Sequence, residues 1–271
     1  MRKIYFQPLL PKSFIVNFIF FLSAVLFFSA TPAHAVVFDM GKEKFGSYLR
    51  SSYLPSWQGA TDPFAQSSGA NLAFNDQFTN LWSYEFGFLI NAGKVTWRVG
   101  LEVLQPPTLS NVSGKDAASG TVYYTMNSQI TVYTPKIGFE FNLKTWKENR
   151  LWLCAEGGYS TITVQNNYNF TAAGNTQFPG VANFREVVGG TQISYAVAMG
   201  FETLMSDSTT ISMELGYRMM DFASMTETNS VTNFQGNQAG GAKALRNDGV
   251  TNRDINLSGS FVALNLRIWV Y

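Results

Sequence analysis

The sequence predicts an all-β protein, an eight-stranded antiparallel up-and-down barrel whose strands cross a membrane. Only 14% of its 271 residues are charged, whereas 15% are aromatic, and an average soluble domain carries about 25% charged residues. Apolar and polar residues alternate along eight segments, so each segment has one apolar and one polar face. The connections between them are alternately short and long, which is typical of transmembrane barrels with tight periplasmic turns and long extracellular loops.

Residues 1–35 are predicted to be a secretory signal peptide, and residues 36–271 the barrel domain. Three cations precede an apolar run over residues 13–30, and Ala33-His34-Ala35 forms a small-x-small cleavage pattern. The alternative is an uncleaved membrane anchor. Without those three cations the chain has 16 basic and 18 acidic residues, from totals of 19 and 18. That balance excludes a basic surface for nucleic acid.

The strands are expected in order along the chain. The first, in residues 45–53, has the weakest alternation: Phe45, Leu49 and Tyr53 share one face, while Tyr48 and Arg50 share the other. The seven others show clear alternation and lie in residues 81–91, 95–103, 133–143, 151–160, 192–202, 211–219 and 262–270.

The apolar faces of these strands are bulky throughout, and we expect them to contact lipid. The clearest lipid-facing candidates are Trp82, Phe86, Trp97, Val99, Phe139, Phe141, Tyr217 and Leu266. The alternative is a soluble barrel or sandwich, which would hide its aromatic face and expose its charged one.

The polar faces carry six acids and five bases, which we expect to meet in the lumen. They are Arg50, Glu85, Arg98, Glu102, Lys136, Glu140, Glu156, Glu202, Glu214, Arg218 and Arg267. Eight strands enclose a lumen just wide enough for side chains to fill. Counting from the short turns predicts an acidic layer near the turns and a cationic layer above it. The network is either a structural plug or a gated path for small ions or solutes.

The predicted turns are residues 91–94, 144–150 and 205–208. The predicted long loops are residues 55–80, 105–128, 164–190 and 221–257, which are rich in Asn, Ser, Thr, Gly and Gln. These loops are either solvated caps or contact surfaces.

The leader, the eight alternating segments and the aromatic C-terminus resemble the small eight-stranded outer-membrane proteins of Gram-negative bacteria, such as the transmembrane domain of OmpA, OmpX and OmpW. The resemblance implies a monomer without metal or cofactor, inserted by the outer-membrane assembly machinery with periplasmic chaperones, among outer-membrane lipids and lipopolysaccharide. It also implies that Trp269 and Tyr271 are the terminal assembly signal. Both share the parity of Asn265 and Arg267, which predicts a bulge or an exit from the membrane there.

Three functions remain open at this point. The first is a structural, envelope-integrity or surface-contact role with a lumen largely filled by charged side chains. The second is a small passive channel of the OmpW or porin kind, and the third is an adhesin or surface antigen acting through the long loops. Catalysis is not expected, because barrel enzymes of the outer membrane rely on histidine and the only histidine, His34, lies in the leader.

Overall fold

The computed structural model describes residues 38–39, 42–54, 72–74, 76, 78, 80–245 and 252–270. The predicted signal peptide and Tyr271 lie outside these residues. Within them no helix is long and apolar enough to cross a membrane.

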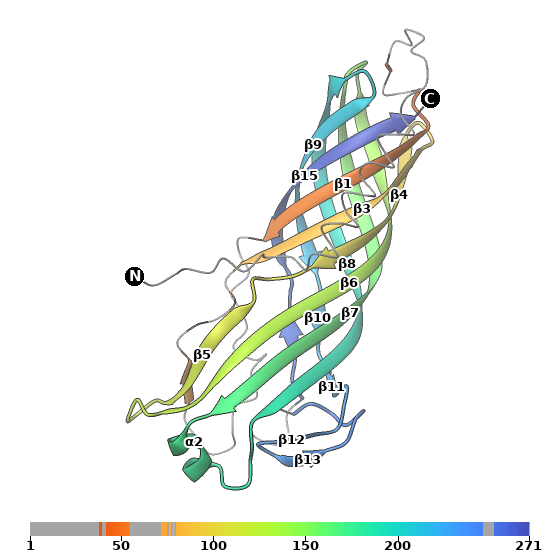
Figure 1. Cartoon of the computed structure of the whole chain (residues 1–271). Coiled ribbons are helices and arrows are strands. Elements are labelled where there is room, and N and C mark those ends of the chain that lie inside the picture. The colour runs from red at the N-terminus through yellow and green to blue at the C-terminus, as the bar shows by residue number, and fades with distance from the viewer. Residues whose placement is uncertain are drawn as a thin grey trace, which may run out of the picture. The chain divides into compact units, whose positions relative to one another are not determined.

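Eight antiparallel strands form a closed ring (Figure 1). They are β1 (Phe45–Leu54), β3 (Leu81–Asn91), β4 (Val95–Leu104), β6 (Val122–Thr145), β7 (Asn149–Phe170), β8 (Phe184–Ser206), β9 (Thr209–Met219) and β15 (Gly259–Val270). Each pairs with the next along this series, and β15 closes the ring on β1 with Arg50 opposite Asn265. The predicted barrel topology is therefore confirmed.

Three short connections lie at one end of the barrel. They consist of residues 92–94, 146–148 and 207–208, and each joins two neighbouring strands of the ring. Gly93 has a φ of +82° in the first of these turns, a conformation that favours glycine because it has no Cβ. The predicted short turns are thus confirmed, although each is tighter than expected.

The burial pattern is the reverse of that in a soluble protein. Along β3, side chains alternate between buried and exposed at every residue. Phe86 and Phe88 are 45% and 50% exposed, whereas Glu85, which directly precedes Phe86, is 2% exposed. Because burying a charge is unfavourable and exposing large apolar side chains to water is also unfavourable, this distribution requires an apolar solvent around the barrel.

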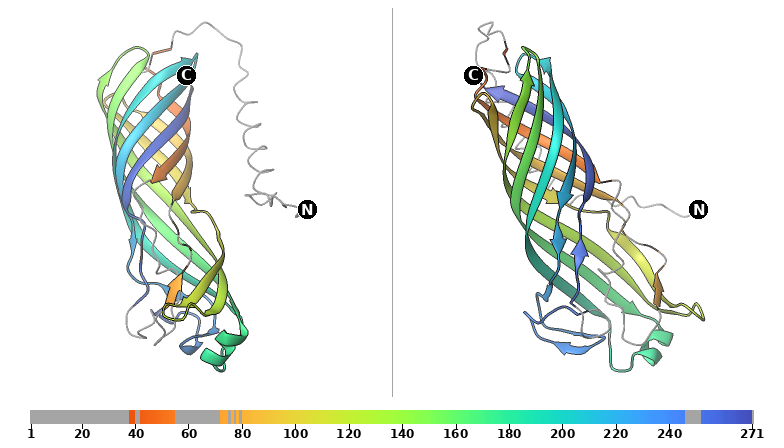
Figure 2. Two further views of the ribbon diagram at one scale, coloured as in Figure 1. Left: turned by 90° about the vertical axis from the view of Figure 1, so that its left-hand side faces the viewer. Right: turned by 180° about the vertical axis from the view of Figure 1, so that it is seen from behind.

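Three strands extend far beyond the others at the end opposite the short turns (Figures 1 and 2). Strands β6, β7 and β8 contain 24, 22 and 23 residues, whereas the other ring strands contain 10 to 12. Crossing a bilayer takes about 9 to 11 residues per strand. Roughly half of each extended strand therefore stands outside the membrane.

These extensions correct the predicted loops 105–128 and 164–190. The first contains β5 (Leu109–Asp116) and the start of β6, and the second contains the end of β7, α2 (Ala172–Gln177) and the start of β8. Alternation continues there with its sides exchanged: Met126, Val164 and Val188 point inward, and Thr125 and Gln165 point outward. Polar residues on the outward face favour a loop when the sequence is considered alone. The alternation with a period of two nevertheless continues through both segments.

Further short strands line the extension. Strand β2 (Leu72–Phe74) pairs with β5, and β5 with β6. The predicted loop 221–257 contains β10 (Asp221–Phe222), β11 (Thr226–Glu227), β12 (Val231–Asn233), β13 (Gly236–Gln238) and β14 (Ile255–Asn256). Strand β11 pairs with β8, so this segment is attached to the wall of the extension. The predicted loop 55–80 lies largely outside the described residues.

The extension has an apolar core of its own. Its aromatic cluster comprises Tyr124, Tyr168, Phe170, Phe178, Phe184 and Phe234. The core continues to Leu54, Leu81, Leu104 and Phe261. These residues lie at the ends of the ring strands opposite the short turns, here called the upper ends, so that the short turns are at the lower end of the barrel. Polar residues therefore fill the barrel within the membrane, and apolar residues fill the space above it.

Candidate functional site

Among the residues that the structure describes, twelve charged side chains lie in the lumen of the ring, each at most 8% exposed. The acids are Glu85, Glu102, Glu140, Glu156, Glu202 and Glu214, and the bases are Arg50, Arg98, Lys136, Arg150, Arg218 and Arg267. All eleven residues of the predicted lumen network lie here. Arg150 is the twelfth: it occupies the second position of β7, within what the sequence had suggested was a turn. With Arg150 included, six bases face six acids.

The layer nearest the short turns is a box of two carboxylates and two guanidinium groups. Arg150 donates to Glu140 at 2.8 Å and to Glu202 at 2.6 Å. Arg267 donates to the same two carboxylates at 2.7 and 2.8 Å. The indole of Trp269 also donates to Glu202, at 3.1 Å. Four ion pairs in a buried box strongly constrain the strands that carry them.

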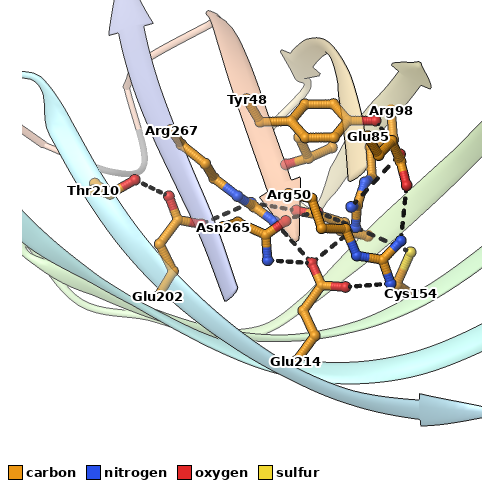
Figure 3. Close-up of polar contacts among 12 residues, drawn as sticks. Tyr48, Arg50, Glu85, Arg98, Cys154, Glu202, Thr210, Glu214, Asn265 and Arg267 are labelled. Atoms are coloured by element: carbon orange, nitrogen blue, oxygen red, sulfur yellow. Dashed lines mark hydrogen bonds and ion pairs between the residues drawn. The ribbon is translucent and has the colours of Figure 1, made fainter. Parts of the chain in front are cut away.

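The middle layer joins strands from opposite sides of the ring (Figure 3). Arg50 contacts Glu85 at 2.8 Å and Glu214 at 3.0 Å. Arg98 contacts Glu214 at 3.1 Å and Glu140 in the layer below at 3.3 Å. The hydroxyl of Tyr48 donates to Glu85. The middle and lower layers are therefore one continuous network.

The upper layer centres on Lys136. Its ammonium group lies 2.6 Å from Glu156 and 3.1 Å from Glu102. Glu102 also pairs with Arg218 and accepts a hydrogen bond from Ser83 at 2.5 Å. Acids and bases are mixed at every level, so the predicted acidic lower and cationic upper layers are wrong. Arg150, which is not part of the predicted network, adds positive charge to the layer nearest the short turns.

Lumen glycines make room for aromatic rings. A Cβ on Gly200 would lie 2.2 Å from Cζ2 of Trp152, and one on Gly216 would lie 2.5 Å from Cζ of Phe261. The guanidinium of Arg267 lies 5.1 Å from the Trp152 ring centroid, and that of Arg50 lies 4.8 Å from the Phe261 centroid. Such contacts favour a cation over a ring face. The rings thus pack against the charged side chains of the lumen.

The position of Trp269 differs from the prediction of a bulge near the end of the last strand. Strand β15 continues without a bulge opposite β1 through Trp269 and Val270, and the Trp269 side chain is buried beside Glu202 and Thr210. It points into the lumen because it shares the parity of Arg267. No phase reset occurs, and Trp269 does not form an outward aromatic pair.

The predicted lipid-facing residues form the outer surface of the ring. Trp82, Phe86, Trp97, Val99, Phe141, Tyr217 and Leu266 are each at least 40% exposed. Phe139 lies on the same face and is half-buried, because it packs edge-on against Trp97 and Phe141.

A second buried cluster of charged residues lies in the extension, beyond the ring strands and their lipid-facing residues. Arg253 forms a bidentate pair with Glu186, at 2.8 and 3.1 Å. Glu227 on β11 lies beside this pair. Burial and the neighbouring Glu186 carboxylate raise the pKa of Glu227 to about 8. Sequence reasoning missed this cluster because it placed all three residues in loops.

In the described part of the chain, the charged groups of the lumen are arranged as pairs of acids and bases. Within the described residues no three His, Cys, Asp or Glu side chains are grouped as a metal site would require. The buried acids are instead paired with Arg and Lys. Such a lumen can fix strand register and fill space.

A closed ring of strands with an apolar exterior and an ion-paired interior defines a transmembrane β-barrel, and a barrel with short turns at one end and long extensions at the other is of the outer-membrane type. The chain is therefore an integral outer-membrane β-barrel protein.

The chain was compared with protein families, with curated protein sequences and with solved structures. No protein-family description matches the chain, and no curated protein sequence matches it. Among solved structures it is similar to the outer membrane protein OprG from Pseudomonas aeruginosa, at 10% identity and a TM-score of 0.42 over 85% of this chain and 98% of that one. It is also similar to outer membrane protein AlkL, at 8% identity and a TM-score of 0.41 over 89% and 96% of the chains.

Proposed function

We propose that this protein is a non-conducting barrel of the outer membrane that anchors a rigid extracellular scaffold for surface contact. The observation that carries this proposal is that side chains fill the barrel axis both inside the ring and in the extension. Six acids and six bases are mutually paired within the ring, and the apolar core of the extension begins directly above them.

The charge network supports a structural role for the lumen. Burying an ion takes several kcal/mol of desolvation, which is offset only by close and well-oriented partners. Here Glu140 has three cationic partners within 3.3 Å. A passing ion or solute would have to displace several such contacts at once.

The extension supports the surface-contact role. Strands β6, β7 and β8 continue as one paired sheet from the membrane into the extension, with β7 in register with β8 as far as Tyr168 opposite Phe184. A sheet with its own core presents its outer residues on a fixed backbone, whereas a solvated loop would not.

Planar-bilayer recording of the refolded full chain tests the proposal. We expect no steady single-channel conductance from the wild-type protein. A stepwise conductance that changes in Glu140→Gln would refute it and favour the small passive channel. If the adhesin alternative is correct, deleting residues 229–240 should abolish attachment of bacteria to host cells or matrix while the barrel remains folded.

We further propose that the barrel is a monomer, inserted by the assembly machinery with β15 as its recognition strand. The pairing of β15 with β1, which closes the ring, supports this role. Trp269 would contribute through its buried hydrogen bond to Glu202 rather than through lipid contact.

A further inference from the structure

The outward face of the extended strands carries a regular array of hydroxyl and amide side chains, here called the threonine–amide face. It consists of Thr125, Asn127, Gln129 and Thr131 on β6, Thr161, Thr163, Gln165, Asn167 and Asn169 on β7, and Thr191 on β8. All ten side chains are exposed or half-exposed.

Strand register aligns these residues in rows. Thr131 lies opposite Thr163, Gln129 opposite Gln165, and Asn127 opposite Asn167. Neighbouring strands are about 4.8 Å apart, and alternate residues along a strand are about 6.7 Å apart. The face is therefore a grid of polar groups on a continuous sheet.

The chemistry of the grid fits an uncharged, hydroxyl-rich ligand. Threonine hydroxyls and side-chain amides both donate and accept hydrogen bonds, as sugar hydroxyls do. Arg185 is the one charged side chain beside the grid among the described residues of these three strands, and it is bonded to Gln165 at 2.5 Å. An anionic partner would require several cations. A protein partner would require several aromatic or aliphatic anchors, whereas between Arg185 and Thr191 the outward face of β8 offers one aliphatic side chain, Val187, opposite Gln165.

The grid continues the lipid-facing surface without a break. On β6 the outward series runs from Ile137 through Tyr133 to Thr131, and on β7 from Tyr159 to Thr161. Ile137, Tyr133 and Tyr159 are each more than half exposed, at 57%, 52% and 55%. A glycolipid whose acyl chains contact the apolar part therefore has its saccharide at the height of the grid.

We propose that the threonine–amide face binds the uncharged polysaccharide of the lipopolysaccharide that surrounds the barrel. This inference rests on the proposed surface-contact function and names the partner of the extended wall. Bound polysaccharide would hold the extension upright within the saccharide layer.

The test uses the full chain refolded in nanodiscs and deacylated O-polysaccharide with uncharged repeat units. The triple variant Gln129→Met, Thr131→Val, Thr163→Val removes hydrogen-bonding groups while keeping side-chain size and β-branching. The control variant Thr232→Val makes the same chemical change on the exposed face of β12. We expect wild type and control to bind alike in saturation-transfer NMR, and the triple variant to bind about tenfold more weakly or not at all.

Equal binding by the triple variant, or no binding by the wild type, would overturn the proposal. Preference for the phosphorylated core oligosaccharide would also overturn it, as would self-association that the triple variant abolishes. Planar-bilayer recording of the same refolded protein distinguishes the failure of this inference from the failure of the proposed function. A non-conducting barrel that does not bind polysaccharide contradicts only this inference, whereas a conducting barrel contradicts the proposed function.

Discussion

Replacing Glu140 with glutamine should destabilise the barrel more than any other neutralisation of a single acid in its lower layer. The Glu140 carboxylate accepts from Arg267 at 2.7 Å, from Arg150 at 2.8 Å and from Arg98 at 3.3 Å. Glutamine has nearly the same shape but no charge, so three buried guanidinium groups lose a shared counter-ion. Breaking a buried ion pair by removing one partner typically costs about 3 to 5 kcal/mol.

The free energy of unfolding can be measured by urea titration in lipid vesicles, with the heat-dependent gel shift of folded barrels as the readout. The matched control is Glu148→Gln, because Glu148 is exposed in the turn between β6 and β7, where a surface charge contributes about 0 to 1 kcal/mol. The double variant Glu140→Gln, Arg267→Met restores charge balance and should recover part of the loss. A Glu140→Gln effect no larger than that of Glu148→Gln would mean that water replaces the carboxylate, and the reasoning would be refuted.

Three further predictions concern the lipid face, the lumen packing and the extension. Trp97→Arg places a charge on the lipid-facing surface and should lower the unfolding free energy by about 2 to 4 kcal/mol if it lies at mid-bilayer; equal tolerance of Thr163→Arg and Trp97→Arg in the urea titration would contradict the lipid assignment. Gly200→Ala should cost about 1 to 3 kcal/mol by overpacking against Trp152, whereas Gly157→Ala, whose Cβ would be 3.7 Å from its nearest neighbour, should be neutral; similar unfolding midpoints for both would disprove the close contact. Because the folded-state pKa of Glu227 is raised to about 8 from 4.5, its stabilising contribution is complete below about pH 4.5 and is lost as pH rises through 8. Limited proteolysis of the 221–257 segment should therefore speed up between pH 6 and 9 in the wild type but not in Glu227→Gln, and the same pH response in both would exclude this group.

The sequence was sufficient to predict the ring because period-two alternation and turn length are local properties. Strand β3 was predicted with its observed bounds, and even the weaker β1 was phased correctly, with Tyr48 and Arg50 inside. The parity argument also assigned the lumen acids, because a strand residue can point only inward or outward.

The extension was missed because the surrounding solvent changes along a single strand. Below Tyr133 on β6 the outside is lipid and apolar residues point outward, whereas above it the outside is water and they point inward. A search for apolar residues on one fixed face therefore reads the upper half of the strand as a loop. Arg150 was missed for a different reason: it lies next to a turn, where the alternation is too short to be recognised.

In this barrel apolar side chains face lipid, and ion-paired side chains meet at the axis. This arrangement can be probed by methyl NMR of the wild-type protein in nanodiscs whose lipid acyl chains carry a spin label. We predict strong broadening of the methyl signals of Val99, Ile137 and Leu264, with Ala196 and Ala263 much less affected. Broadening of the two alanines together with protection of Val99, Ile137 and Leu264 would show that the barrel has the opposite orientation of its faces.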